Sequence, residues 1–206
     1  MSRPAGRGDP SLVLVPTALE LRALEACGGL PPGHAILAAC GFGPAAAAKA
    51  AALIRTLRPA RALLLGIAGS LDPGALPVGS AAAFARVAID GLDTAGFELA
   101  PGLGLGTAIA LQGGEGLLVT VATPSRSRAE SASLAARHAG ATAEDMEGFG
   151  VAVACALAGV PLAILRGISN EAGDRDRSRW RIPEAVAAAR ELSIALLGGD
   201  PGREAS

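Results

Sequence analysis

The stretch of sequence that decides the fold reads Glu144-Asp145-Met146-Glu147-Gly148, then the apolar run 149–165, then Arg166-Gly167-Ile168-Ser169-Asn170. The apolar run has 17 residues and carries no charge. A membrane-spanning helix needs roughly 20 residues, and a proline at position 161 interrupts this run near its end. A buried part of an α/β domain is therefore expected here, and not a membrane helix.

Within this stretch the pattern predicts three elements. A helix of small residues is expected over 147–158, a turn over 159–161, and a buried strand over 162–165 that delivers Ser169 and Asn170 at its carboxyl end. Ligands of open α/β sheets bind at the carboxyl ends of the strands. The polar Ser-Asn loop is thus expected to lie where a ligand would bind.

The composition fits one globular domain. The 206 residues are 50% hydrophobic and include 28 Gly and 14 Pro, which is enough for a sizeable core. A formal net charge of −1 gives no basic surface for nucleic acid. We expect a single domain over 11–198, with disordered ends at 1–10 and 199–206.

Cysteine and histidine give no sign of a metal or a disulfide framework. The three cysteines, at positions 27, 40 and 155, form no CxxC pair, and the two histidines stand alone. No metal and no cofactor are therefore expected. The polar first ten residues and the short apolar stretch behind them do not make a signal peptide, so we expect a cytoplasmic protein.

Strands and helices alternate along the rest of the chain. Thr17 is expected to cap a helix, because Glu20 follows three residues later in the capping-box pattern. Strands are expected over 12–15, 35–39, 61–65, 80–88 and 117–122, helices over 45–57, 127–138 and 183–197, a turn over 66–70, and a loop with a short hairpin over 90–116. This order predicts a single three-layer α/β domain with a central mixed sheet flanked by helices.

Four motifs then appear in a recognisable order: Glu20, Gly66-Ile67-Ala68-Gly69, the stretch 143–148, and the stretch 166–170. Over most of 12–197 this order resembles the nucleoside phosphorylase and nucleosidase superfamily. The stretch 144–180 is most similar to the futalosine hydrolases of the alternative menaquinone pathway. The resemblance implies a homo-oligomeric nucleoside hydrolase that releases hypoxanthine from futalosine without a metal or cofactor.

The resemblance assigns catalytic roles to Glu20, Glu147 and Asn170. Cleavage of an N-ribosidic bond builds positive charge on the sugar and negative charge on the base. Glu147 would accept hydrogen bonds from the ribose hydroxyls and stabilise the cationic sugar. Glu20 would orient and deprotonate the attacking water, although its position also suits a purely structural capping box with Thr17.

Asn170 stands where adenine-releasing relatives carry an aspartate. An amide cannot give up a proton to the leaving base, but its NH₂ group can bond to N7 or O6 of a 6-oxopurine. Asn170 therefore favours hypoxanthine as the base, with a plain Asx turn as the structural alternative.

Seven further residues are expected to bind substrate through backbone or side chain: Ala68, Gly69, Asp145, Met146, Phe149, Ser169 and Asp174. Met146 would pack on the sugar, and the backbone of Ala68 and Gly69 would line the nucleophile site. Phe149 also suits the core. The charged run that begins at Asp174 is either solvated or in contact with the carboxylate-bearing 5′ substituent of the substrate.

Water is expected to be the nucleophile. Phosphorylases place an arginine just before the glycine motif, and this chain has Leu63-Leu64-Leu65 there. The open alternatives are a nucleosidase or phosphorylase for another purine nucleoside, such as 6-amino-6-deoxyfutalosine or methylthioadenosine, and a nucleoside-binding protein without activity. In each case the expected partner is a small purine nucleoside, and neither nucleic acid nor a membrane.

Overall fold

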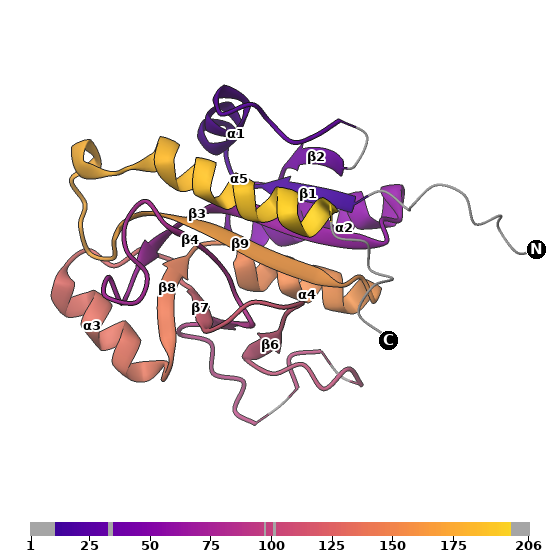
Figure 1. The fold of residues 1–206 in the computed structure, drawn as a ribbon. Helices are drawn as coiled ribbons and strands as arrows, with labels where there is room; N and C mark the ends of the chain where they lie inside the picture. The colour runs from indigo at the N-terminus through magenta and orange to yellow at the C-terminus, as the bar shows by residue number, and fades with distance from the viewer. Residues whose placement is uncertain (1–10, 33–34, 97, 101, 199–206) are drawn as a thin grey trace, which may run out of the picture.

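The computed structural model describes residues 11–32, 35–96, 98–100 and 102–198, which form three layers (Figure 1). Helices α1 (Ala18–Ala26) and α5 (Ile182–Gly198) cover one face of a mixed sheet. Helices α2 (Gly43–Leu57) and α4 (Gly148–Ala158) cover the other face. The predicted three-layer α/β fold is confirmed, whereas the expected disordered ends lie outside the described residues.

Strand β3 (Arg61–Ser70) organises the sheet. It runs parallel to β1 (Ser11–Val15) and to β9 (Leu162–Glu171), and its last two residues pair antiparallel with β8 (Ala141–Asp145). The carboxyl end of β3 therefore lies between β8 and β9. The remaining strands are β2 (Ala35–Ala39), β4 (Ala81–Ala83), β5 (Arg86–Ile89), β6 (Ala108–Ala110) and β7 (Leu117–Thr120). The order of strands in the sheet is β2-β1-β3-β8-β7-β5-β6, and β9 pairs with both β3 and β4.

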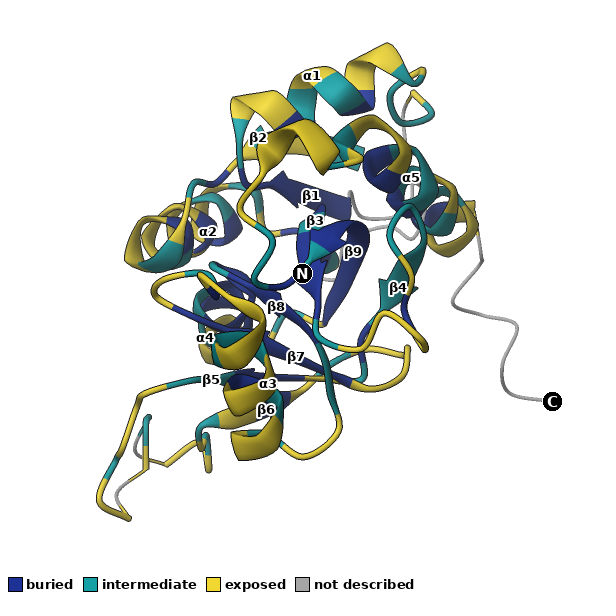
Figure 2. Cartoon of the chain, turned by 90° about the vertical axis from the view of Figure 1, so that its left-hand side faces the viewer, coloured by how far each residue is buried: buried dark blue, intermediate teal, exposed yellow. Residues whose placement is uncertain are grey.

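The core lies on both faces of the central strands. Figure 2 shows β1, β3 and β9 as buried between the two helix layers. Leu64 and Ile164 pack toward α2 and α4, and their chain neighbours Leu65 and Leu165 pack toward α1 and α5. Strands covered on both faces need apolar residues at every position, which explains the uninterrupted apolar runs in the sequence. Helix α3 (Arg128–Arg137) packs through Leu134 against β5 and β7.

Two expected strand ends are wrong. Strand β3 continues through the expected turn over 66–70, and β9 continues through the expected Ser-Asn loop. Ser169 and Asn170 are therefore strand residues: Asn170 pairs with Gly69 of β3, and Ser169 lies at the irregularity where the register between the two strands shifts by one residue. The glycines of β3 favoured the wrong prediction of a turn. Gly66 provides room for neighbouring side chains and does not have the positive φ of a turn glycine.

The strand expected over 80–88 is also wrong, because the chain there forms two strands with different partners. Strand β4 pairs with β9, whereas β5 pairs with β6 and β7. Strand β8 was not expected, since Ala-Thr-Ala-Glu-Asp has little strand propensity of its own. Its pairing with β3 and β7 fixes its conformation. The helices and the first two strands are confirmed, with shifts of one or two residues at most of their ends.

None of the helices in the described parts of the chain is both long and apolar enough to cross a membrane.

Candidate active site

A fully buried arginine lies at the centre of the polar side chains around β3 and β9. Arg166, on β9, is 0% exposed, and its Nη2 forms ion pairs with Asp145 and, at 2.7 Å, with Glu147 Oε1. Its Nε and Nη1 atoms have no hydrogen-bond partner within the described residues. A buried guanidinium ordinarily has partners for its donors, so these two atoms keep a hydrogen-bonding capacity that the described residues do not use.

Gly66 is what allows this arginine to approach Glu20. A Cβ atom at position 66 would meet Arg166 Nη1, Glu20 Oε1 at 2.6 Å and Pro16 Cδ at 2.9 Å. The carboxylate of Glu20 and the guanidinium of Arg166 thus lie next to each other over a residue without a side chain. This close approach explains the glycine in the middle of a buried strand.

Glu20 is held from two sides in the first turn of α1. Its backbone N–H donates to Thr17 Oγ1 at 3.1 Å, which confirms the predicted cap. Its carboxylate accepts from the Thr17 hydroxyl and, at 2.8 Å, from the backbone N–H of Ile67. Burial raises the pKa of Glu20, and these hydrogen bonds act in the opposite direction. The capping role and a place in the site are therefore compatible.

Glu147 precedes α4 and faces the same guanidinium. Burial raises the pKa of Glu147 to about 8, although Arg166 lowers it; the nearby Asp145 and Glu20 raise it further. Because Glu147 has no side-chain hydrogen bond to the start of its helix, its carboxylate is not used as a cap.

The carboxylate of Asp145 is bound by groups of the protein itself. Its carboxylate accepts from the Thr120 hydroxyl at 2.6 Å and from the Gly148 N–H at 2.9 Å, and it pairs with Arg166. These contacts fix the start of α4 and the position of the guanidinium. The role of Asp145 as a substrate contact stays a prediction.

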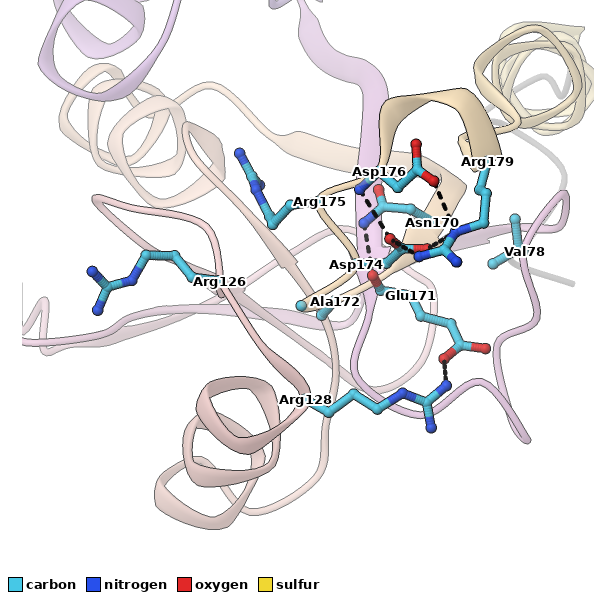
Figure 3. Close-up of a pocket in the computed structure, with 11 residues that line it drawn as sticks. Val78, Arg126, Arg128, Asn170, Glu171, Ala172, Asp174, Arg175, Asp176 and Arg179 are labelled. Carbon is cyan, nitrogen blue, oxygen red and sulfur yellow. Dashed lines mark hydrogen bonds and ion pairs between the residues drawn. The ribbon is translucent and has the colours of Figure 1, made fainter.

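Asn170 lies at the carboxyl end of β9, opposite Gly69 of β3. Its Nδ2 donates to the Glu171 carbonyl at 2.8 Å, and its Oδ1 accepts from the Ser169 hydroxyl at 2.8 Å. Ala68 and Gly69 are the residues of β3 that pair alongside this segment. Asn170 also borders a pocket of about 700 Å³ formed by the segment 170–176 with Val78, Arg126, Arg128 and Arg179 (Figure 3).

The other predicted substrate contacts lie in different surroundings. Met146 is half-buried, and its carbonyl accepts from the Gly43 N–H at 2.9 Å. Phe149 is buried within the core on the α2 and α4 face. Asp174 borders the pocket, where its carboxylate binds Arg179 at 2.6 Å. The roles of these residues toward a substrate stay predictions.

Arg166 has no predicted function, although it begins the motif 166–170. The sequence did contain a signal, since Arg166 is a charged residue in an otherwise apolar strand. A charged residue is almost never fully buried unless it is paired, so a buried partner of opposite charge could have been predicted. The described residues contain no group of three or more His, Cys, Asp or Glu side chains that could hold a metal ion.

Comparisons with known proteins show the family of this chain. The family model of the phosphorylase superfamily matches residues 26–198. The chain is 45% identical to the futalosine hydrolase of Streptomyces coelicolor over 181 residues, which are 77% of this chain and 76% of that one. It is 33% identical to the futalosine hydrolase of Thermus thermophilus, covering 93% of this chain and 96% of that one.

Among solved structures, the fold is similar to a 5′-methylthioadenosine/S-adenosylhomocysteine nucleosidase from Colwellia psychrerythraea in complex with adenine. The TM-score is 0.79 at 19% identity, over 93% of this chain and 96% of that one. The chain therefore belongs to the phosphorylase superfamily and, within it, to the family of the futalosine hydrolases.

Proposed function

We propose that this protein is a nucleoside hydrolase that cleaves the N-ribosidic bond of futalosine and releases hypoxanthine, in the alternative pathway of menaquinone biosynthesis. One observation supports the proposal: Glu20 and Glu147 both lie close to Arg166 at the level of Gly66 in β3, and Asn170 lies three residues further along this strand, opposite Gly69. The 45% identical relative is a futalosine hydrolase, which supports the same substrate.

In this proposal Glu20 activates the attacking water. Its carboxylate and Arg166 Nη1 both lie close to the space above Gly66 without bonding to each other, and Nη1 has no hydrogen-bond partner in the described structure. A water molecule between the two would donate to the carboxylate and accept from the guanidinium, so one oxygen lone pair stays directed toward the sugar. A raised pKa makes Glu20 a stronger base than an exposed glutamate.

Glu147 and Met146 hold the ribose. The free carboxyl of Glu147 has its pKa raised to about 8 by burial, and two ribose hydroxyls that donate to it would favour the ionised form. A bound sugar therefore restores the negative charge at the place where the sugar becomes cationic. This stabilises the transition state more than the free substrate.

Asn170 binds the base. Its carboxamide can donate to N7 or O6 of hypoxanthine, where an ionised carboxylate would repel the carbonyl oxygen. We expect its Nδ2 to exchange the Glu171 carbonyl for the purine when substrate binds.

Water suits this site better than phosphate. Arg166 is the cation of the cluster, and Asp145 and Glu147 already share its charge. Asp145 alone offsets the charge of Arg166 even where Glu20 and Glu147 are protonated, so no net positive charge remains for a phosphate ion. We further propose that the protein acts in the cytoplasm as a homo-oligomer, with a purine nucleoside as its small-molecule partner.

The test is to incubate the protein with futalosine, inosine or methylthioadenosine, with and without phosphate, and to follow the free base by chromatography. We expect hypoxanthine from futalosine at the same rate with and without phosphate. A phosphorylated sugar product would show a phosphorylase, faster release of adenine would show a nucleosidase for another substrate, and binding without turnover would show a protein that has lost its activity.

The variant Glu147→Gln sharpens this test. The amide keeps the shape of the side chain but removes the charge, so kcat/KM should fall by at least about 100-fold. Far-UV circular dichroism checks that the variant is folded. Activity close to that of the unchanged protein would contradict the ribose role of Glu147.

A further inference from the structure

One arginine at the pocket beside Asn170 lacks an acidic partner. Arg128 pairs with Glu171 at 2.7 Å, Arg179 with Asp174 at 2.6 Å, and Arg126 with Glu130 at 2.8 Å. Arg175 has no ion pair and no side-chain hydrogen bond to another described residue. Figure 3 shows its side chain extending away from the cluster of Asp174 and Arg179. Burial raises the pKa of Glu144, and Arg175 is among the groups that lower it, so this carboxyl is nearby although no ion pair or hydrogen bond joins the two side chains. Arg175 is thus the arginine of this pocket that forms no ion pair with a described residue.

The position of Arg175 is supported by an aromatic ring. Its guanidinium carbon lies 5.7 Å from the centre of the Trp180 ring, within the range of a cation–π interaction. The indole N–H of Trp180 donates to the Asp174 carbonyl at 3.1 Å, which ties the ring to the start of the same loop. A guanidinium that is already oriented loses less entropy when it binds an anion than a freely rotating one.

The loop that carries Arg175 is packed tightly on a second loop. Gly173 has φ +90°, and a Cβ atom there would collide with the backbone of Ser127 and lie 2.8 Å from the Arg128 N atom. Next to this contact, Glu144 accepts hydrogen bonds from Ser125, from its N–H at 3.0 Å and its hydroxyl at 2.6 Å. The two sides of the pocket mouth are therefore held at a fixed spacing.

We propose that Arg175 binds a carboxylate of the substrate, at the end of the molecule remote from the scissile bond. This inference rests on the proposed function, in which the 5′ substituent of the nucleoside carries a carboxylate. The guanidinium would form a charge-assisted hydrogen bond to that group. Arg128 and Arg179 would have to give up an existing carboxylate first, so neither can replace Arg175 without a loss.

The test compares futalosine with its methyl ester, which has the same base, ribose and substituent but no negative charge. The variants are Arg175→Gln and, as a matched control, Arg177→Gln. Arg177 is also exposed and lies 5.9 Å from the centre of the Trp180 ring, but it does not border the pocket. For the unchanged protein we expect kcat/KM to be about tenfold to a hundredfold higher for the acid than for the ester.

In Arg175→Gln this preference should disappear because the rate with the acid falls to that with the ester, while Arg177→Gln should keep it. The inference is overturned if Arg175→Gln retains the preference, if Arg177→Gln loses it equally, or if the unchanged protein shows none. If the unchanged protein hydrolyses neither compound, the proposed function fails as well. Thermal melting of both variants checks that each is folded.

Discussion

Two of the regions that contain arginine–carboxylate pairs differ completely in their surroundings. In the site around β9, the side chains of Arg166, Asp145 and Glu147 are 0%, 1% and 3% exposed. At the pocket mouth, the side chains of Arg128 and Arg179 are 86% and 66% exposed. Water and salt screen the second group of charges but not the first. The same pair of residue types therefore has different energetic consequences in each region.

The supporting backbone differs in the same way. Arg166 lies within a strand that is paired on both sides, so its position is fixed by the sheet. The pocket mouth is built mostly from the loops after β7 and β9. Bond cleavage needs fixed charges, whereas recognition of a substituent can vary with loop sequence. Under the proposed function, the groups for bond cleavage are held against the sheet, whereas recognition of the substituent depends on the loops.

The largest effect is expected from Arg166→Met. Removal of the guanidinium leaves the buried carboxylate of Asp145 without its cationic partner, so the free energy of unfolding should fall by about 3–5 kcal/mol. Urea unfolding followed by circular dichroism measures it. A loss similar to that of an exposed pair would mean that the buried site is not energetically distinct.

The second prediction concerns pH. The pKa of Glu147 is raised to about 8 in the folded protein, from an ordinary value of 4.5, so the folded state keeps this proton longer than the unfolded chain. Its contribution to stability is complete below pH 4.5 and is lost as the pH rises through 8, with a slope of at most about 1.4 kcal/mol per pH unit. In Glu147→Gln the decline of stability between these pH values should be flatter. An unchanged pH profile would contradict the raised pKa.

A third, smaller effect is expected from Gly66→Ala. The added methyl group would push against Glu20 and Arg166, so the free energy of unfolding should fall by about 1–3 kcal/mol. Gly106→Ala is the matched control, because position 106 has open space around it and should change stability by no more than about 0.5 kcal/mol. Equal stabilities of the two variants would show that the close approach at Gly66 is not needed.

The smallest effect is expected from Arg128→Gln. Its pair with Glu171 is exposed on the arginine side, so its loss should reduce the free energy of unfolding by no more than about 1 kcal/mol. The difference should vanish in about 1 M salt, where the screening length is roughly 3 Å. Urea unfolding at low and high salt measures both values. If the loss of unfolding free energy were the same at low and high salt, this pair would behave like the buried pairs and the prediction would be wrong.

The sequence by itself determined the fold class, most helix positions and the order of the motifs. These features are local: apolar runs predict buried strands, alanine-rich segments predict helices, and Thr17 with Glu20 predicts a cap. The family resemblance also singled out Glu20, Glu147 and Asn170; the structure places both glutamates near Arg166 and Asn170 opposite Gly69, and their joint role in one site stays a prediction.

Only the tertiary structure decided where β3 and β9 end, that β8 is a strand, and what Arg166 contacts. Each of these depends on residues distant in the chain. Strand β8 is a strand because β3 and β7 pair with it. Gly66 favours a turn by its local sequence, and only its close approach to Arg166 and Glu20 explains a glycine within a strand. The tertiary structure also decides that Arg175 forms no ion pair, because the nearby acidic residues Glu171 and Asp174 already pair with Arg128 and Arg179. The local sequence determines which conformation a segment prefers, whereas its pairing and packing with distant strands determine which conformation it adopts.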